Sequence, residues 1–120
     1  MLKTQNSKQY DLEERTLEFA KSIREFIKKL PKSLTNLEYI KQLIRSSGSV
    51  GANYIEANEA LSKRDFIMRI KISRKEAKEA RYWLQLIDIP NPVLGEKSNE
   101  LIKETTELMM ILSSIMRNSQ

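Results

Sequence analysis

The sequence predicts an all-α protein: an antiparallel up-down-up-down four-helix bundle in which residues 1–120 form a single domain. Two observations support this fold class. Apolar residues recur every three or four positions in four separate stretches, which is the spacing of one face of a helix. The chain also holds only 3 Gly and 3 Pro, which are too few turn residues for an all-β fold of 120 residues.

The first helix is expected over about residues 11–30, after a polar tail at residues 1–8. Its apolar residues form one stripe and share a spacing of three, four or seven positions: Leu12, Phe19, Ile23, Phe26 and Leu30. Acidic residues lie in its first turn and Lys28 and Lys29 in its last, which suits the helix dipole. Pro31 ends it.

The second helix is expected over about residues 35–61, with an N-cap among Ser33–Thr35. Its apolar or small positions cover a wide arc, which indicates more than one neighbour. One stripe is Leu37, Ile40, Ile44, Ser47, Gly51, Tyr54, Asn58 and Leu61, and a neighbouring stripe is Tyr39, Leu43, Val50 and Ala57. Small residues gather at positions 46–52, and each Gly costs about 1 kcal/mol of helix propensity relative to Ala. Close approach of another backbone explains them, and a break in the helix near Ser46–Ser49 is the alternative.

The third helix is expected over about residues 63–88, capped by Ser62, with a core stripe that contains Phe66, Ile70, Ala77 and Leu84. Pro90 and Pro92 then interrupt the chain, and residues 89–98 read as a loop. The fourth helix is expected over about residues 96–117.

The composition argues against most enzymes. The chain has no Cys and no His, which removes thiolate chemistry, the commonest general base and the commonest metal ligand. We therefore expect no enzymatic activity, no cofactor and no bound metal. A cage of Glu56, Glu59, Glu76 and Glu79 is the one carboxylate alternative, and a charge network with Arg45, Arg69 or Arg81 explains these residues better.

The third helix carries most of the excess positive charge. The net charge is +5, and residues 61–90 hold 8 basic and 4 acidic groups. Six basic residues recur at helical spacing and form the candidate nucleic-acid-binding face: Arg64, Lys71, Arg74, Lys75, Lys78 and Arg81. Such a stripe can follow a phosphate backbone, with Lys21, Arg24 and Lys28 of the first helix as further contacts. A solvated surface is the alternative.

A second group of residues reads as a structural or interface set. Ser49, Asn53 and Glu56 share one helix face, and a polar seam explains them better than a catalytic site, because no intermediary base or oxyanion hole is visible. Ile72 and Trp83 lie off the core stripe of the third helix, together with Glu79. A large apolar group at that position indicates a subunit interface, with contacts inside a splayed bundle as the alternative.

Residues 42–87 carry a resemblance to a known family. A Ser-rich turn at Ser46–Ser49 is followed by the pattern S-x-x-x-N-x-x-E, a polar joint and a D-F-I helix start, which fall on Ser49, Asn53 and Glu56, on Ser62–Arg64, and on Asp65–Ile67. This arrangement resembles the four-helix bundle family encoded in intervening sequences of bacterial 23S ribosomal RNA genes. Glu79 falls where that family tends to have an acidic residue. Ala57 stands where many members have Gly, so we expect the second helix to continue further here.

The resemblance implies a homo-oligomeric ring, a homopentamer. The family includes relatives of the accessory variability determinant of diversity-generating retroelements, which are similar basic rings thought to bind nucleic acid and to work with a reverse transcriptase. The leading hypothesis is therefore a non-enzymatic oligomer that binds RNA or DNA through backbone phosphates. The alternative is a protein-interaction or scaffolding module that binds no nucleic acid.

The sequence also bears on localisation. The first residues contain no apolar signal-peptide core, and no apolar run approaches the roughly 18 residues that span a membrane. We expect a soluble cytoplasmic protein without a membrane partner.

Overall fold

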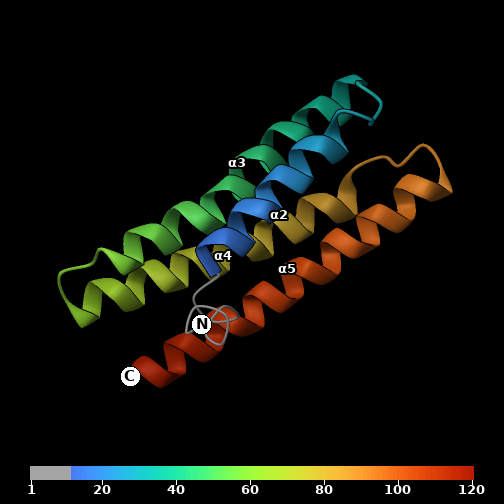
Figure 1. Cartoon of the computed structure of the whole chain (residues 1–120). Coiled ribbons are helices and arrows are strands. Elements are labelled where there is room, and N and C mark those ends of the chain that lie inside the picture. Colours follow the sequence, from blue (N-terminus) through green and yellow to red (C-terminus); the bar gives the residue numbers. More distant parts are fainter. Residues whose placement is uncertain (1–11) are drawn as a thin grey trace.

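A computed structural model describes residues 12–120 and contains four helices in this range (Figure 1). These are α2 (Leu12–Ile27), α3 (Leu34–Asn58), α4 (Lys63–Leu86) and α5 (Pro92–Ser119). No strand occurs between residues 12 and 120, so the all-α prediction is confirmed there. The predicted tail at residues 1–8 and the predicted first helical residue, Asp11, lie outside the described residues.

The helices lie side by side around one apolar core, and the molecule measures 44 × 31 × 19 Å. The closest pairs are α3 with α4 and α4 with α5, while α2 contacts α3 more extensively than α5 (Figure 1). Each helix contributes side chains that are almost fully buried, among them Ile23, Leu43, Val50, Ile70, Leu84, Leu108 and Leu112. Burying an aliphatic side chain of this size stabilises the fold by about 1.5–3 kcal/mol.

The apolar stripe predicted for the first helix is confirmed, whereas that of the second helix is partly wrong. All five residues of the first stripe are buried. In α3, Leu37 and Ile44 are about half exposed, and Leu61 is 98% exposed in the turn that follows. The neighbouring stripe predicted for this helix forms the core of α3: Leu43, Val50 and Ala57 are buried, together with Ser46, because α3 packs most extensively on α4.

Three helix boundaries differ from the prediction. α2 ends at Ile27, because Lys29 and Leu30 close a tighter turn onto the carbonyl groups of Phe26 and Ile27. α3 ends at Asn58 and not near residue 61, and the backbone N–H groups of Glu59 and Ala60 close the same kind of turn. The expected extension of this helix was therefore wrong.

The predicted loop at residues 89–98 is wrong from residue 92 onward. α5 begins at Pro92, because the Asn91 side chain accepts a hydrogen bond from the Leu94 N–H at 2.9 Å and caps the helix. Pro92 stands at the first helical position, where its missing N–H costs no hydrogen bond. This proline therefore starts the helix that it was expected to precede.

The small residues of α3 allow two close contacts, and the helix runs unbroken through Ser46–Ser49. A Cβ added to Gly51 would lie 2.8 Å from Thr16 Oγ1 of α2, so only Gly fits there. On the other side, Ser73 of α4 donates a hydrogen bond to the Val50 carbonyl at 2.7 Å. The predicted close approach is thus confirmed for Gly51. Gly48 faces open space, so close packing inside the chain does not explain it.

A buried asparagine ties the two connections at one end of the bundle together. The Asn36 amide donates to the Pro31 carbonyl at 2.9 Å and to the Asp88 carbonyl at 3.4 Å, and its oxygen accepts from the Asp88 N–H at 2.8 Å. Asn36 is only 1% exposed, so water cannot replace these bonds. This one side chain holds the α2–α3 connection against the end of α4.

The two glycines of α3 give a matched pair of substitutions. Both G51A and G48A gain about 1 kcal/mol of helix propensity. Only G51A presses on Thr16, whose hydroxyl is held by the Leu12 and Glu13 carbonyl groups. Overpacking of this kind costs about 1–3 kcal/mol. Urea unfolding at low protein concentration should show G51A less stable than G48A by that amount, and equal stability would contradict the close approach.

Loss of the Asn36 side chain should destabilise the fold. N36A leaves the Asp88 N–H and the Pro31 carbonyl without their partner, which costs about 1–3 kcal/mol. N36D keeps the acceptor for Asp88 but buries a carboxylate against the Pro31 and Asp88 carbonyl oxygens, so its unfolding midpoint in urea at neutral pH should fall at least as far as that of N36A. An N36A midpoint equal to that of the wild type would show that the connections do not depend on this residue.

Candidate nucleic-acid interface

The six predicted nucleic-acid-binding residues all lie on α4, in two rows. Arg64, Lys71, Lys75 and Lys78 are exposed. Arg74 and Arg81 are half-buried where α4 meets α5. Together the two rows cover the side of α4 that faces solvent and α5.

Arg74 and Arg81 reach across to α5. Arg74 donates a hydrogen bond to the Ser113 hydroxyl at 3.2 Å, and Arg81 donates one to the Thr106 hydroxyl at 3.2 Å. Arg117 lies beside Ser113 and lines the same surface hollow as Thr106 and Ser113. Sequence reasoning missed these three residues of α5. Thr106 and Ser113 are seven residues apart, as Arg74 and Arg81 are, and this matching spacing was the signal that could have pointed to the two hydroxyls.

The carboxylates in the middle of α4 are turned toward α3. Glu76 and Glu79 lie 3.3 Å and 2.9 Å from the Arg45 guanidinium of α3. Glu76 is buried, and its hydrogen bond is the main reason that the pKa of Arg45 is raised above its ordinary value. The predicted charge network is therefore confirmed for Glu76 and Glu79 with Arg45, on the side of α4 away from α5. It is not confirmed for Glu56 and Glu59, which form no salt bridge within residues 12–120. Arg69 and Arg81 bind Asn53 and Thr106 instead.

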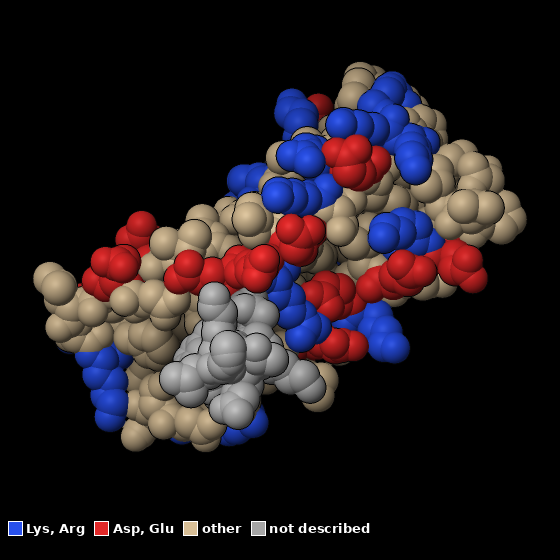
Figure 2. Space-filling model, viewed as in Figure 1, with Lys and Arg blue, Asp and Glu red and all other residues tan. Residues whose placement is uncertain are grey.

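The carboxylates of α5 are turned toward α2. Arg15 of α2 binds Glu104 at 2.8 Å and Glu107 at 2.7 Å, and the hydrogen bond to Glu104 contributes most to raising the pKa of Arg15. Glu96 and Glu100 precede Glu104 by eight and four residues, so they lie on the same side of α5. Figure 2 shows the resulting band of acidic side chains across the face of α2 and α5.

The result is a surface along α4 and α5 that carries cations and almost no carboxylates. We call it the basic seam and define it as Arg64, Lys71, Arg74, Lys75, Lys78 and Arg81 of α4 with Arg117 of α5. Asp65 follows Arg64 at the N-terminal end of α4, while Glu76 and Glu79, which follow Lys75 and Lys78 in sequence, are bound to Arg45. Within residues 12–120 no seam residue forms a salt bridge. The seam therefore has unneutralised positive charge available for a polyanion.

The basic residues suggested on the first helix differ from the seam because they form salt bridges. Lys21 pairs with Glu18 at 3.7 Å, and Arg24 and Lys28 pair with Glu25 at 3.0 and 3.1 Å. Figure 2 shows further basic side chains gathered near the end of α2. Each of these three residues forms a salt bridge, although Arg24 and Lys28 share the one carboxylate of Glu25, and we therefore rank them below the seam, whose residues form none within residues 12–120.

The polar set on α3 forms hydrogen bonds within the bundle. Ser49 donates to the Arg45 carbonyl at 2.8 Å, and the Asn53 amide donates to the Ser49 carbonyl at 2.9 Å. Arg69 of α4 donates to the Asn53 oxygen at 3.0 Å, while Glu56 is exposed. Ser49 thus has its hydroxyl engaged by its own helix, and no base is placed to activate it.

Trp83 is covered inside the chain. Its ring packs 6.1 Å from Tyr39 of α3 and 5.2 Å from Tyr82, and its indole N–H is buried without a hydrogen-bond partner. Ile72 is half-buried on the same side of α4, one turn before Glu76. Contacts within the bundle therefore account for the coverage of Trp83, and a role for Ile72, Glu79 and Trp83 between subunits remains a prediction.

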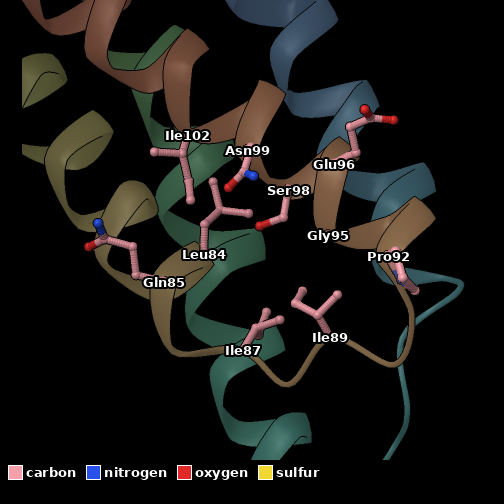
Figure 3. A pocket seen from close by; sticks show the side chains of 10 residues that line it. All are labelled: Leu84, Gln85, Ile87, Ile89, Pro92, Gly95, Glu96, Ser98, Asn99 and Ile102. Carbon is pink, nitrogen blue, oxygen red and sulfur yellow. The ribbon is translucent and has the colours of Figure 1, made fainter.

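The residues that line a hollow at the α4–α5 connection do not resemble an active site. Figure 3 shows Ile87 and Ile89 pointing from the connection toward Leu84 and Ser98. Its other polar side chains are those of Gln85, Asn99 and Glu96.

Among the described residues no group of His, Cys, Asp or Glu is arranged to hold a metal ion. The helices of residues 12–120 include none long and apolar enough to cross a bilayer.

Comparison with known proteins places the chain in a family. None of the curated proteins matches it significantly. A solved structure from Bacteroides thetaiotaomicron, described as a protein of unknown function from the S23 ribosomal protein family, is 34% identical with a TM-score of 0.76, over 87% of this chain and 96% of that one. The sequence profile of the 23S rRNA-intervening sequence proteins matches residues 8–114. The resemblance seen in the sequence is thus confirmed, and the chain belongs to the 23S rRNA-intervening sequence protein family.

Proposed function

We propose that this protein is a non-enzymatic nucleic-acid-binding protein whose basic seam contacts the phosphates of RNA or DNA. The observation that carries the proposal is the separation of charge around α4 and α5. Glu76 and Glu79 are held by Arg45, and Glu104 and Glu107 by Arg15, so the seam between them is cationic. A surface of this kind attracts any polyanion, and nucleic acid is the commonest one in cells.

The dimensions of the seam suit a nucleic-acid backbone. From Arg64 to Arg81 it follows α4 for 17 residues, which is about 26 Å at 1.5 Å per residue. One strand of B-form DNA rises about 3.4 Å per nucleotide, so the seam spans about seven or eight nucleotides. Tyr82, which is 57% exposed and one turn after Lys78, offers one aromatic ring for base stacking, which does not depend on sequence. Binding through phosphates, with little reading of base sequence, fits this composition.

The absence of enzymatic activity is part of the proposal. The chain has no His and no Cys. The Ser49 hydroxyl donates to a backbone carbonyl, and the buried Glu76 is held by Arg45. Within residues 12–120 these two side chains are thus engaged, which supports a protein without catalytic activity.

We also propose that the working form is a homo-oligomeric ring of up-down-up-down bundles, with five subunits as the family resemblance implies. An exposed apolar stripe along α2 and α3 supports self-association: Leu17, Leu37, Ile44 and Ile55 are each 40–52% exposed. Leu17 and Ile44 line one groove, together with Ala20 and Gly48. This stripe lies on the α2 side of α3, away from α4, so assembly through it leaves the seam open. A protein partner such as a reverse transcriptase is the alternative occupant.

Loss of charge from the exposed row of the seam should weaken binding and its salt dependence together. Each lost phosphate contact lowers the slope of log K against log salt by about 0.9 for duplex DNA, so K71Q/K75Q/K78Q should lower it by roughly 2.7. The control K29Q/K41Q/K97Q removes the same charge from other faces and should change the slope little. Fluorescence anisotropy with a labelled duplex over a salt series measures both, and equal slopes for the two triple variants would contradict the site.

A charge placed on the apolar stripe should dissociate the ring. I44K puts a cation where the stripe would be covered by another subunit, which costs several kcal/mol unless the charge is paired. The control L61K alters an exposed leucine in the α3–α4 turn, away from the stripe. Light scattering coupled to size exclusion should give a mass near five chains for the wild type and L61K, and one chain for I44K. A monomeric wild type, or an intact I44K oligomer, would refute this assembly surface.

A further inference from the structure

The contacts of Arg74 and Arg81 with α5 repeat each other. Arg81 follows Arg74 by seven residues on α4, and its partner Thr106 precedes Ser113 by seven residues on α5. Each arginine donates from one terminal nitrogen to a hydroxyl at 3.2 Å. Seven residues are two helical turns, so the two arginines stand about 10.5 Å apart along the seam.

Both arginines have most of their hydrogen-bonding capacity unused. A guanidinium has five N–H donors, and each arginine gives one of them to α5. Two other arginines that cross between helices are matched with carboxylates, Arg15 with Glu104 and Glu107 and Arg45 with Glu76 and Glu79, whereas Arg69 bonds the neutral Asn53. Arg74 and Arg81 are half-buried and have only a neutral partner. A partly desolvated cation without a counterion is costly, and a bound anion removes that cost.

The hydroxyl partners fix how each guanidinium is presented. Ser113 and Thr106 each accept a hydrogen bond from one terminal nitrogen of their arginine. The other terminal nitrogen and Nε of each guanidinium are therefore left to donate to a ligand. Thr106 is held in turn, because its hydroxyl donates to the Ile102 carbonyl at 3.2 Å. Thr106, Ser113 and Arg117 line one hollow, together with Met109 and Met110, so a ligand can reach this side of the seam.

We propose that Arg74 and Arg81 form two equivalent phosphate subsites, oriented by Ser113 and Thr106, which hold two phosphates of one nucleic-acid strand lying along α4 and α5. The proposal rests on the proposed function and deepens it, because it assigns ligand-binding roles to two residues and positioning roles to two hydroxyls. The spacing of about 10.5 Å along α4 leaves room for each arginine to hold its own phosphate.

Removal of the hydroxyls tests the positioning role. T106V and S113A keep the charge of the seam, so each should weaken binding of a labelled RNA about three- to tenfold while the salt slope stays unchanged. R74Q and R81Q lose one charge each and should lower both affinity and slope, the slope by about 0.7–0.9. R74K and R81K keep the charge but lose the planar guanidinium, so they should weaken binding while the salt slope stays unchanged, as in the hydroxyl variants. S114A, a half-buried serine that follows Ser113 on α5, is the matched control.

A second readout separates this inference from the proposed function. Side-chain Nε–Hε signals of Arg74 and Arg81 should shift on titration with RNA, and also with tripolyphosphate, while those of Arg15 stay in place. If RNA binds but T106V and S113A equal S114A, or if the two signals do not move, the subsites are wrong and the function stands. If RNA does not bind but tripolyphosphate moves both signals, the function is wrong and the subsites hold another phosphate ligand. If neither ligand moves them, both proposals are refuted.

Discussion

The close contact between α3 and α4 fixes how α4 is rotated about its axis, and the character of every other surface depends on that rotation. Ser73 donates to the Val50 carbonyl at 2.7 Å, and Ala77 and Ala80 are fully buried beside it. Small side chains let the two backbones approach, so this face of α4 has to point inward. Glu76 and Glu79 then meet Arg45, and the cationic residues are left facing solvent and α5.

The ion pairs that close the bundle also determine where its free charge lies. Arg15 draws Glu104 and Glu107 to the α2 side of α5, and Arg45 draws Glu76 and Glu79 to the α3 side of α4. The exposed pair of Arg45 with Glu79 contributes only about 0–1 kcal/mol to stability, while Arg45 offsets part of the cost of burying the Glu76 carboxylate. The larger effect of the ion pairs is electrostatic, because they take carboxylates away from the side that α4 and α5 share. Arg15 and Arg45 thus connect helices of the bundle and also keep carboxylates away from the seam.

The sequence predicted where the helices lie better than it predicted which side of each helix is buried and which residues lie opposite. Periodicity located all four helices and the buried face of α2, because a single stripe admits one orientation. It left two stripes open for the core of α3, because small and apolar residues surround most of the helix and only packing against α4 selects Leu43 over Ile44. Pro92 was read as a breaker, since its role as a first helical residue depends on the Asn91 cap. The six basic residues of α4 were found, whereas Thr106, Ser113 and Arg117 depend on which helix lies opposite.

The central claim is that phosphates bind along the side of α4 that faces solvent and α5, and lysine footprinting tests it most directly. The protein is acetylated briefly with and without RNA at low salt, and the modification of each lysine is read by mass spectrometry. We predict that RNA protects Lys71, Lys75 and Lys78, while Lys29, Lys41 and Lys97 react equally in both conditions. Protection of Lys29 and Lys41 with unchanged reactivity at Lys71, Lys75 and Lys78 would contradict the account.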